Sequence, residues 1–589
     1  MANLNHILGG LLNPFPAPDL WPAQNFSDLD FASERLSLEA TENFFATCPR
    51  AAWFAGELTR FLDDAEGLRV IKKYFHVVYE LRMRNIANQA DPPSDYGFGA
   101  FAIQTPAHPI ETACRNDLVA AFPDRTFPQT EVSTVGRLRH LVSVYAWGAA
   151  LLAKSAWIGL SRGRAVVEPR RARLVAPPFW PQARWRQIVG ALLNAGASEQ
   201  NLLMFTRERE PDPSHTAGDH AVLHDRDMFV PRGEWWRRVM WPTLKLAVRV
   251  FAVTPSCWSE PRNIEAARIS LHLAFMSLDI WRVAFNVRFD YCLDIYEYGP
   301  QHLLKGIVFR KFGGAVARLP HSQMDTPGCA LSYLSYDLFL TSGAYQGAAD
   351  PATWMPGMRQ VCTGQMLMDH RFSHHQAAEN AVTCEIERIA GQGRRIAAFF
   401  GPSSGFGLLE VAAQLLHVLW SELCRTDGWT LVIKPKGTNA FFDILASKPQ
   451  FREILDDPRV VCVRYGEPGK EVCPSGWLLS KATMGVSLPG SVQVEGLTLG
   501  RPVFSYYPVN RDTPLWNRLR DAGLLGADLE TMRRIFRTYF YDPSDAAVSY
   551  DWFRENFEPY GDGRALDRIA AALLDIQPAE DFTDRTSCT

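Results

Sequence analysis

Residues 484–506 read MGVSLPGSVQVEGLTLGRPVFSY and contain a strand, a helix and a second strand in one short stretch. The apolar run 484–488 ends in a Pro-Gly-Ser turn, which opens a helical segment that closes at Gly500. A second apolar run, 502–506, follows directly. Because a helical crossover joins strands that run in the same direction, this stretch predicts part of a parallel sheet.

The same rhythm occurs in two series along the chain. Apolar runs typical of buried strands lie at 173–176, 288–296, 314–319 and 336–341 in the first series and at 395–400, 429–433, 460–463, 484–488 and 502–506 in the second. Helical segments are predicted at 182–194, 408–423 and 564–574. Alternating strands and helices form a parallel sheet covered on both faces. The predicted fold class is therefore α/β, with two doubly wound, Rossmann-like domains at 171–375 and 376–589 that face a cleft.

The first 170 residues have a different, mainly helical pattern. Apolar residues recur at three- and four-residue spacing in 37–48 and 65–89. Ser37 is predicted to cap a helix, and the Pro-rich stretch 92–128 is predicted to be irregular.

Composition excludes several classes of protein. The 589 residues carry 61 Lys and Arg against 64 Asp and Glu, a net charge of −3, so nucleic acid is not an expected partner. A hydrophobic content of 47% excludes a mostly disordered chain. Eleven cysteines form no CxxC pair, and the first residues lack the pattern of a secretory signal. Reduced thiols and a cytoplasmic location are expected.

Residues 137–249 carry an excess of positive charge, with 18 Lys and Arg against 9 Asp and Glu. Within this region, 141–160 carries one charge, Lys154, and suits either a buried helix, a helix lying on a membrane or a spanning helix. Segment 233–251 interleaves three tryptophans with basic residues. It predicts either a packed aromatic helix or peripheral contact with the inner face of the plasma membrane.

Two segments that follow predicted strands of the second domain could hold an anion. Ser403, Ser404 and Gly405 lie in a Gly/Ser turn before a helix, where backbone N–H groups can bind a phosphate, although a plain tight turn explains them equally well. Lys434 and Lys436 follow the next strand, and their alternative is a solvated lysine pair.

The helix that begins near Ser491 gives the sharper signal. Ser491 lies where a hydroxyl can donate to a phosphate oxygen, and Glu495, one turn later, can accept from ribose or sugar hydroxyls. The alternative for Ser491 is an N-cap with no other role.

The order of Lys434-Pro435, Ser491-x-x-x-Glu495 and Gly500-x-Pro-Val resembles the carboxyl-terminal half of GT-B glycosyltransferases that build bacterial surface polysaccharides. The most similar groups are capsule polysaccharide transferases, Kdo and sialic-acid-type transferases and CDP-glycerol glycerophosphotransferases. In several of these groups, His follows the Lys-Pro pair. This chain has Lys436 at that position. A lysine provides a positive charge there, as a protonated histidine would, but it is less suited to proton transfer. The resemblance covers roughly residues 290–510 and no part of the first 170.

The resemblance implies a GT-B-like fold in which domain 376–589 binds the nucleotide-sugar and domain 171–375 faces the acceptor. A transferase that inverts the anomeric centre needs one base to take the acceptor proton. His321, oriented by Asp325, could be that base, and Glu297 is its rival. Each also has a structural explanation: a loop contact, a turn, or an ion pair with Lys305 or Arg310. The sequence has no metal-binding motif, so a metal-free, cofactor-free mechanism is expected.

The predicted function is transfer of a sugar from a nucleotide-activated donor to a surface glycan or lipid-linked acceptor. Alternatives are a nucleotide-sugar epimerase or hydrolase of the same fold, a transferase that modifies a protein such as flagellin, and a non-catalytic scaffold of the polysaccharide machinery.

Overall fold

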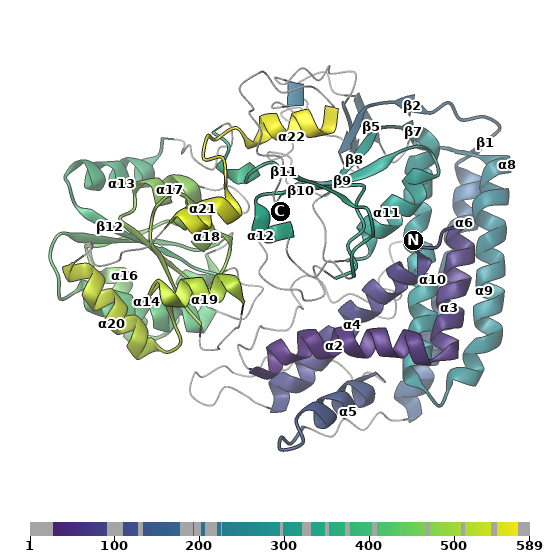
Figure 1. Ribbon diagram of the computed structural model, residues 1–589, viewed down its shortest axis with the longest axis horizontal. Helices are drawn as coiled ribbons and strands as arrows, with labels where there is room; N and C mark the ends of the chain where they lie inside the picture. Colours follow the sequence, from purple (N-terminus) through teal and green to yellow (C-terminus); the bar gives the residue numbers. More distant parts are fainter. Residues whose placement is uncertain are drawn as a thin grey trace.

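The computed structural model shows two lobes (Figure 1). It describes residues 28–90, 110–127, 134–176, 192–193, 202–206, 221–224, 227–294, 299–320, 332–347, 353–370, 377, 379–402, 409–436, 439–465, 472–507, 513–542 and 550–574.

The second lobe is built on six described strands that all pair in parallel. They are β12 (Arg395–Phe400), β13 (Trp429–Lys434), β14 (Val460–Cys462), β15 (Met484–Ser487), β16 (Val503–Tyr506) and β17 (Leu525–Gly526). The strand order is β14-β13-β12-β15-β16-β17, which is the doubly wound order of dinucleotide-binding folds. Strand order therefore reverses between β12 and β15.

Helices cover both faces of this sheet. They are α13 (Ala381–Gly391), α14 (Leu409–Leu423), α15 (Ala440–Ser447), α16 (Pro449–Asp456), α17 (Ser475–Lys481), α18 (Ser491–Thr498), α19 (Pro514–Asp521) and α20 (Leu529–Tyr541). Successive residues of β12 point to opposite faces, so Phe399 joins the core with α14 and α20, while Phe400 joins the core with α13 and α17. Burial on both sides explains why this strand is apolar throughout.

The first lobe contains seven described strands, also all parallel, in the order β11-β10-β9-β8-β3-β4-β5. They are β3 (Leu174–Ala176), β4 (Leu202–Thr206), β5 (Ala221–His224), β8 (Tyr291–Asp294), β9 (Ala315–Arg318), β10 (Leu338–Thr341) and β11 (Arg359–Cys362). Four short strands, β1 (Gly163–Arg164), β2 (Arg170–Arg171), β6 (Val230–Pro231) and β7 (Val287–Arg288), form two further parallel pairs.

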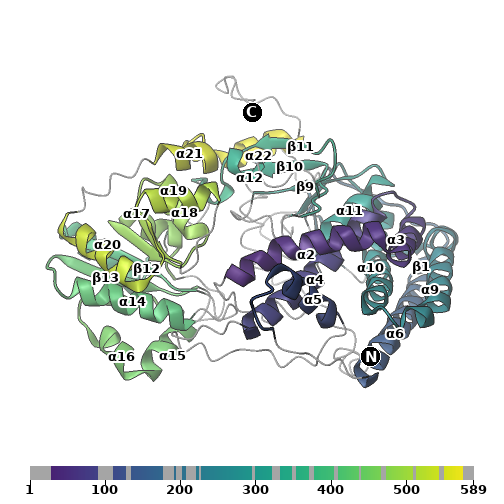
Figure 2. The same cartoon turned by 60° about the horizontal axis from the view of Figure 1, so that its bottom comes forward.

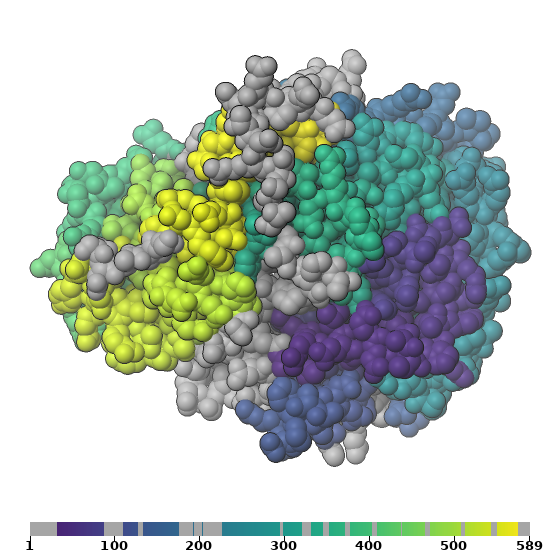
Figure 3. All heavy atoms as spheres, viewed as in Figure 1, coloured from purple at the N-terminus to yellow at the C-terminus, as the bar shows by residue number. Residues whose placement is uncertain are grey.

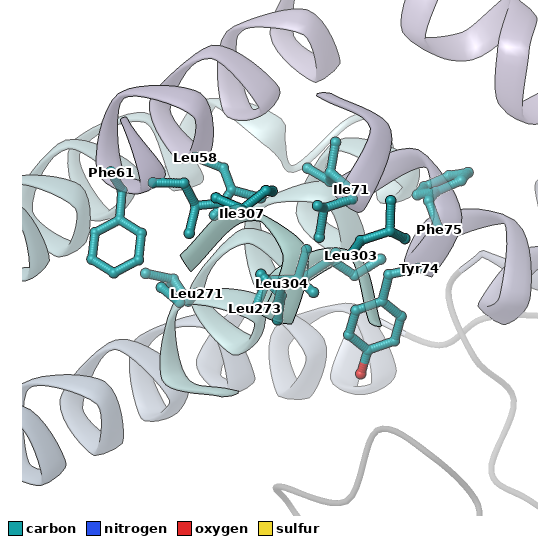
Figure 4. Close-up of a cluster of buried hydrophobic side chains, with 14 of the residues drawn as sticks. Leu58, Phe61, Ile71, Tyr74, Phe75, Leu271, Leu273, Leu303, Leu304 and Ile307 are labelled. Atoms are coloured by element: carbon teal, nitrogen blue, oxygen red, sulfur yellow. The ribbon is translucent and has the colours of Figure 1, made fainter. Parts of the chain in front are cut away.

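The amino-terminal helices form one layer of this lobe. They are α2 (Asp28–Thr47), α3 (Pro49–Leu62), α4 (Gly67–Ala90), α5 (Glu111–Ala121) and α6 (Thr134–Ser161), and they pack with α8 (Arg232–Trp235), α9 (Trp241–Val253), α10 (Pro261–Asn286) and α11 (Gln301–Arg310). Figure 4 shows side chains of α3, α4, α10 and α11 meeting in their core. The same core includes Val316 of β9 and Phe339 of β10, so these helices cover one face of the first sheet.

The other face of the first sheet is covered by the end of the described chain. Helix α22 (Ala565–Leu574) packs Leu566 and Ile569 against Leu293 and Leu340 of the sheet. Before it, α21 (Asp551–Phe557) contacts α18 of the second lobe and α12 (Ala344–Gly347) of the first. The yellow segments in Figure 3 show this return across the two lobes. The chain therefore crosses between lobes twice.

A buried carboxyl group lies at this second crossing. Glu558 accepts a hydrogen bond from the Gln365 N–H, and its carboxylate lies 3.9 Å from the Arg568 guanidinium, which also pairs with Asp562. Burial, aided slightly by the charge of Asp562, outweighs the effect of Arg568 and raises the pKa of Glu558 from 4.5 to about 7.

This shift predicts a pH-dependent stability. Because the folded pKa is the higher one, the contribution of Glu558 is fully present below pH 4.5 and is lost as pH rises through 7. Glu558→Gln should remove up to about 3 kcal/mol of this dependence. Melting curves of both proteins between pH 4.5 and 8 check this: the difference between them should change across that window, and a constant difference would refute the raised pKa.

The predicted fold class, a GT-B-like α/β arrangement of two doubly wound sheets preceded by a mainly helical region, is confirmed by this topology. Two local predictions are wrong. Ser37 lies inside α2, where its hydroxyl donates to the Glu34 carbonyl at 2.9 Å, so it caps nothing. The stretch 92–128 contains helix α5, which buries Cys114 and Leu118. The segment 182–194 lies almost entirely outside the described residues.

Candidate active site

Four residues of the second sheet stand side by side at the carboxyl ends of neighbouring strands. Lys434 pairs in register with Phe400, Phe400 with Ser487, and Ser487 with Ser505. Residues in register share one face of a parallel sheet, and adjacent strands lie about 4.8 Å apart. Strand β12 therefore lies between β13, which carries Lys434, and β15, which carries Ser487. This is the point where strand order reverses. In open α/β sheets this is where ligands bind.

The end of β12 is packed so closely that a side chain on the next residue would be crowded. The Gly401 N–H donates to the Lys434 carbonyl at 2.9 Å. A Cβ atom on Gly401 would lie 3.1 Å from the Phe441 ring and 3.3 Å from Pro435 Cα. The predicted anion-binding residues that follow, Ser403, Ser404 and Gly405, lie outside the described residues.

The turn after β13 is fixed by hydrogen bonds from two other segments. The Tyr465 hydroxyl donates to the Pro435 carbonyl at 3.1 Å. Tyr465 and Asn439 exchange a reciprocal pair, in which the Tyr465 N–H donates to Asn439 Oδ1 and the Asn439 amide donates to the Tyr465 carbonyl. Lys434 is buried, whereas Lys436 is exposed. The structure thus places both predicted lysines at the carboxyl edge, one inside the domain and one at its surface.

Helix α18 begins at the same edge. Its N-cap is Gly490, which has no side chain to cap the helix, so the first backbone N–H groups depend on other acceptors. Ser491 is half-buried at the first helical position, and Glu495 is buried one turn later. A Cβ on Gly496 would overlap Val503, which explains how closely α18 lies on β16. The predicted residues Ser491 and Glu495 therefore belong to the helix that follows β15, one of the two strands at the reversal of strand order.

Sequence reasoning missed two serines near the carboxyl ends of β15 and β16. The hydroxyls of Ser487 and Ser505 are buried without a hydrogen-bond partner among the described residues. A buried unsatisfied hydroxyl costs about 1–3 kcal/mol, so such groups are uncommon away from functional sites. The available signal was that both serines occupy corresponding positions near the ends of apolar strands.

The corresponding edge of the first sheet carries buried charges. Asp294 ends β8 and pairs in register with Arg318, which ends β9. Asp294 binds the Lys305 ammonium at 2.7 Å, and the Arg318 guanidinium donates to the Leu340 carbonyl at 3.2 Å. The predicted alternative pairing of Glu297 with Lys305 or Arg310 is not tested, because Glu297 lies outside the described residues. The buried pair of Asp294 with Lys305 was missed because it joins a strand to the following helix, 11 residues later.

The three predicted catalytic residues, Glu297, His321 and Asp325, lie outside the described residues. The strands that precede them are described. Glu297 follows the end of β8 by three positions, and His321 follows the end of β9 by three. Since β8 and β9 are adjacent and parallel, both segments leave the sheet from the same edge. Their catalytic roles remain predictions.

Elements that follow the carboxyl ends of both sheets contact each other. The Tyr345 ring, just after β10, lies tilted against the Phe557 ring at a centroid distance of 5.0 Å, and its hydroxyl accepts a hydrogen bond from the Leu515 N–H at 3.4 Å. Leu515 begins α19, which follows β16. The carboxyl side of each sheet is thus turned toward the other lobe at this contact.

Two further features bear on the chemistry. In the described part of the chain, no group of three or more His, Cys, Asp or Glu is arranged to hold a metal ion. A pocket of about 440 Å³ lies beside Arg164, Glu168, Asp227 and Asn286, and its lining includes none of the predicted site residues.

No family model and no curated protein matches this chain. Similar solved structures include the S. aureus MnaA-UDP structure (12% identity, 70% of this chain and 100% of that one, TM-score 0.41) and the wall teichoic acid polymerase TagF (9%, 75% and 98%, 0.41). A third is the Methanocaldococcus jannaschii UDP-GlcNAc 2-epimerase in complex with UDP-GlcNAc and UDP (10%, 69% and 100%, 0.38). At these values the similarities assign neither a substrate nor a reaction to this chain.

Proposed function

We propose that the protein is a glycosyltransferase that binds the diphosphate or monophosphate of a nucleotide-activated sugar at the carboxyl edge of its second sheet. The observation that carries this proposal is the row from Lys434 to Ser505 at the reversal of strand order, with the start of α18 beside it. Cations, hydroxyls and a helix N-terminus are the groups that bind phosphate.

These groups would also assist departure of the nucleotide. As the glycosidic bond to phosphate breaks, negative charge grows on the leaving oxygen. Lys434, Lys436 and the first N–H groups of α18 would stabilise that charge without a metal ion. The acceptor hydroxyl would lose its proton to a base that follows β8 or β9, with His321 and Glu297 as the candidates. The acceptor is proposed to be a surface glycan or a lipid-linked glycan.

A screen of nucleotide-sugars tests this function. CMP-, CDP-, UDP- and GDP-activated sugars are added to the full chain, and the melting temperature is measured, since a ligand that binds only the folded state raises it. Binding of one class is expected. Turnover is then followed with and without a glycan acceptor. Turnover that needs the acceptor supports the transferase, turnover without it supports an epimerase or hydrolase, and absence of all binding supports a scaffold.

Replacement of Ser487 by Ala separates a binding role from a structural one. The free protein should be as stable as the wild type or up to about 1–3 kcal/mol more stable, because a buried unsatisfied hydroxyl is removed. Donor affinity should fall several-fold if that hydroxyl binds the ligand. Thermal melting and calorimetry measure the two effects.

Thr430 supplies a matched control. It is also buried, its hydroxyl also lacks a partner among the described residues, and it lies near the opposite end of β13. Thr430→Val should leave donor affinity unchanged. Equal affinity in all three proteins would count against a ligand-binding role for Ser487.

A further inference from the structure

Helix α6 exposes one apolar face along its length. Val135 and Leu160, close to its two ends, are 73% and 70% exposed. Between them, Leu138, Val142 and Trp157 are exposed at helical spacing. Side chains of this size are usually scattered singly on a protein surface, so five of them on one face of a helix indicate a surface that binds something.

The helix that runs from α8 into α9 exposes a second such row. Trp241 and Val248 are 55% and 56% exposed, with Leu244 between them, and Trp236 precedes them. Residues Trp236–Met240 form a π-helical turn. Pro242 follows two positions later and has no N–H to donate to a carbonyl of this turn. The opposite side of α9 buries Leu246 and Val250. The row is therefore the unpartnered face of a packed helix.

The two rows lie on helices that pack side by side, so they belong to neighbouring parts of one surface. The Phe251 ring of α9 fills the space beside Gly148 of α6, where a Cβ atom would overlap it. Near the other end of α6, the indole nitrogen of Trp236 lies 3.9 Å from where a Cβ on Gly159 would be. Trp236 thus lies beside Gly159, on the side of α6 that packs against the helix running from α8 into α9. In Figures 1 and 2, α6 and α9 lie at the end of the molecule far from the second lobe.

The surface is strongly basic. Residues 134–164 and 232–253 together contain ten Lys and Arg and one acidic residue, Glu234. Lys154 pairs with Asp279, Arg238 with Glu234, and Arg249 with Glu57. Lys245 lies 5.2 Å from the Trp241 ring, and Arg162 lies 5.9 Å from the Trp157 ring. Exposed Trp residues beside cations suit the boundary between lipid head groups and acyl chains.

We propose that the exposed faces of α6 and α8–α9 form a peripheral docking surface for a bilayer that contains anionic lipid. Charge complementarity selects this occupant, because the inner leaflet of a plasma membrane is negatively charged. This inference extends the predicted membrane contact at 233–251 to α6 and does not depend on the donor site.

The helix α6 lies on the membrane in this account and does not cross it. By length and composition it is the one described helix that could span a bilayer. However, its inner face buries Trp147, Leu151 and Ile158, and Lys154 pairs with Asp279 of α10 at 2.9 Å. Spanning would break this packing and the ion pair. Alkaline carbonate should therefore release the protein from membranes, and resistance to carbonate would contradict a peripheral surface.

Vesicle flotation of the full chain tests the proposal. The wild type should float with phosphatidylglycerol-containing vesicles and much less with pure phosphatidylcholine vesicles. Joint replacement of Trp241 and Val248 by Glu should reduce partitioning at least tenfold. Joint replacement of Arg237 and Lys245 by Gln should reduce binding to anionic vesicles roughly thirtyfold and leave binding to neutral vesicles little changed.

Tyr541→Glu is the matched control, because Tyr541 is a 67% exposed aromatic residue on α20 of the second lobe. Its vesicle binding should equal that of the wild type. Light scattering gives the oligomeric state of each protein. Equal flotation of all variants would overturn the proposal. So would absence of vesicle binding together with a wild-type dimer that Trp241→Glu dissociates, since the surface would then bind a second copy.

Discussion

Replacement of Lys436 by Ala is expected to weaken donor binding about ten- to hundredfold, which corresponds to loss of one charge-assisted hydrogen bond to phosphate. Lys436 lies two positions beyond the end of β13 and is exposed, so its removal should leave the fold intact. The turn that carries it is fixed by Tyr465 and Asn439 independently of the lysine side chain. Calorimetric titration with the nucleotide-sugar that stabilises the wild type measures the effect.

Lys481→Ala is the control for this experiment. Lys481 ends α17 three positions before β15 begins, so it belongs to the opposite edge of the same sheet, where it pairs with Glu387 at 3.6 Å. Its removal changes the net charge equally and should not change donor affinity. Unchanged affinity in Lys436→Ala, or an equal loss in both variants, would refute a specific phosphate contact by Lys436.

Replacement of His321 by Ala is expected to lower turnover by a factor of about 10²–10⁴ and to leave donor affinity nearly unchanged. The reason is that a base after β9 would act on the acceptor, whereas the other lobe is proposed to bind the donor. Strands β8 and β9 end side by side, because Asp294 pairs in register with Arg318. Glu297→Gln tests the rival base in the same assay.

The two variants give distinguishable outcomes. Loss of kcat in His321→Ala alone would assign the base to His321, with Asp325→Asn then expected to show a smaller loss. Loss in Glu297→Gln alone would transfer that role to Glu297. Retained turnover in both variants would show that the base is another residue. The proposed donor site would not be affected, because the titrations of Lys436→Ala and Lys481→Ala test it separately.

Most strands could be predicted from the sequence because each is a short apolar run between glycine, proline or charged residues. Residues 395–400 coincide with β12, and 429–433 differ from β13 by one residue. Both strands are buried on two faces, so their composition alone identifies them. The helix and turn around Ser491 could be predicted for the same local reason.

Features that depend on distant contacts could not be predicted. Ser37 looked like a helix cap, but tertiary packing extends α2 upstream of it and places its hydroxyl 3.0 Å from the His76 ring. Helix α22 follows the second domain in sequence and packs on the first sheet. The strand register that sets Lys434, Ser487 and Ser505 in one row is likewise a property of the sheet.

Hydrogen–deuterium exchange of the full chain, with and without the stabilising nucleotide-sugar, tests the central claim most directly. Bound donor should slow exchange in residues 429–436 and 484–498, which form the edge where strand order reverses, and Lys436→Ala should reduce this protection at equal donor concentration. Protection confined to residues 174–362, with no change in those two segments, would contradict the account.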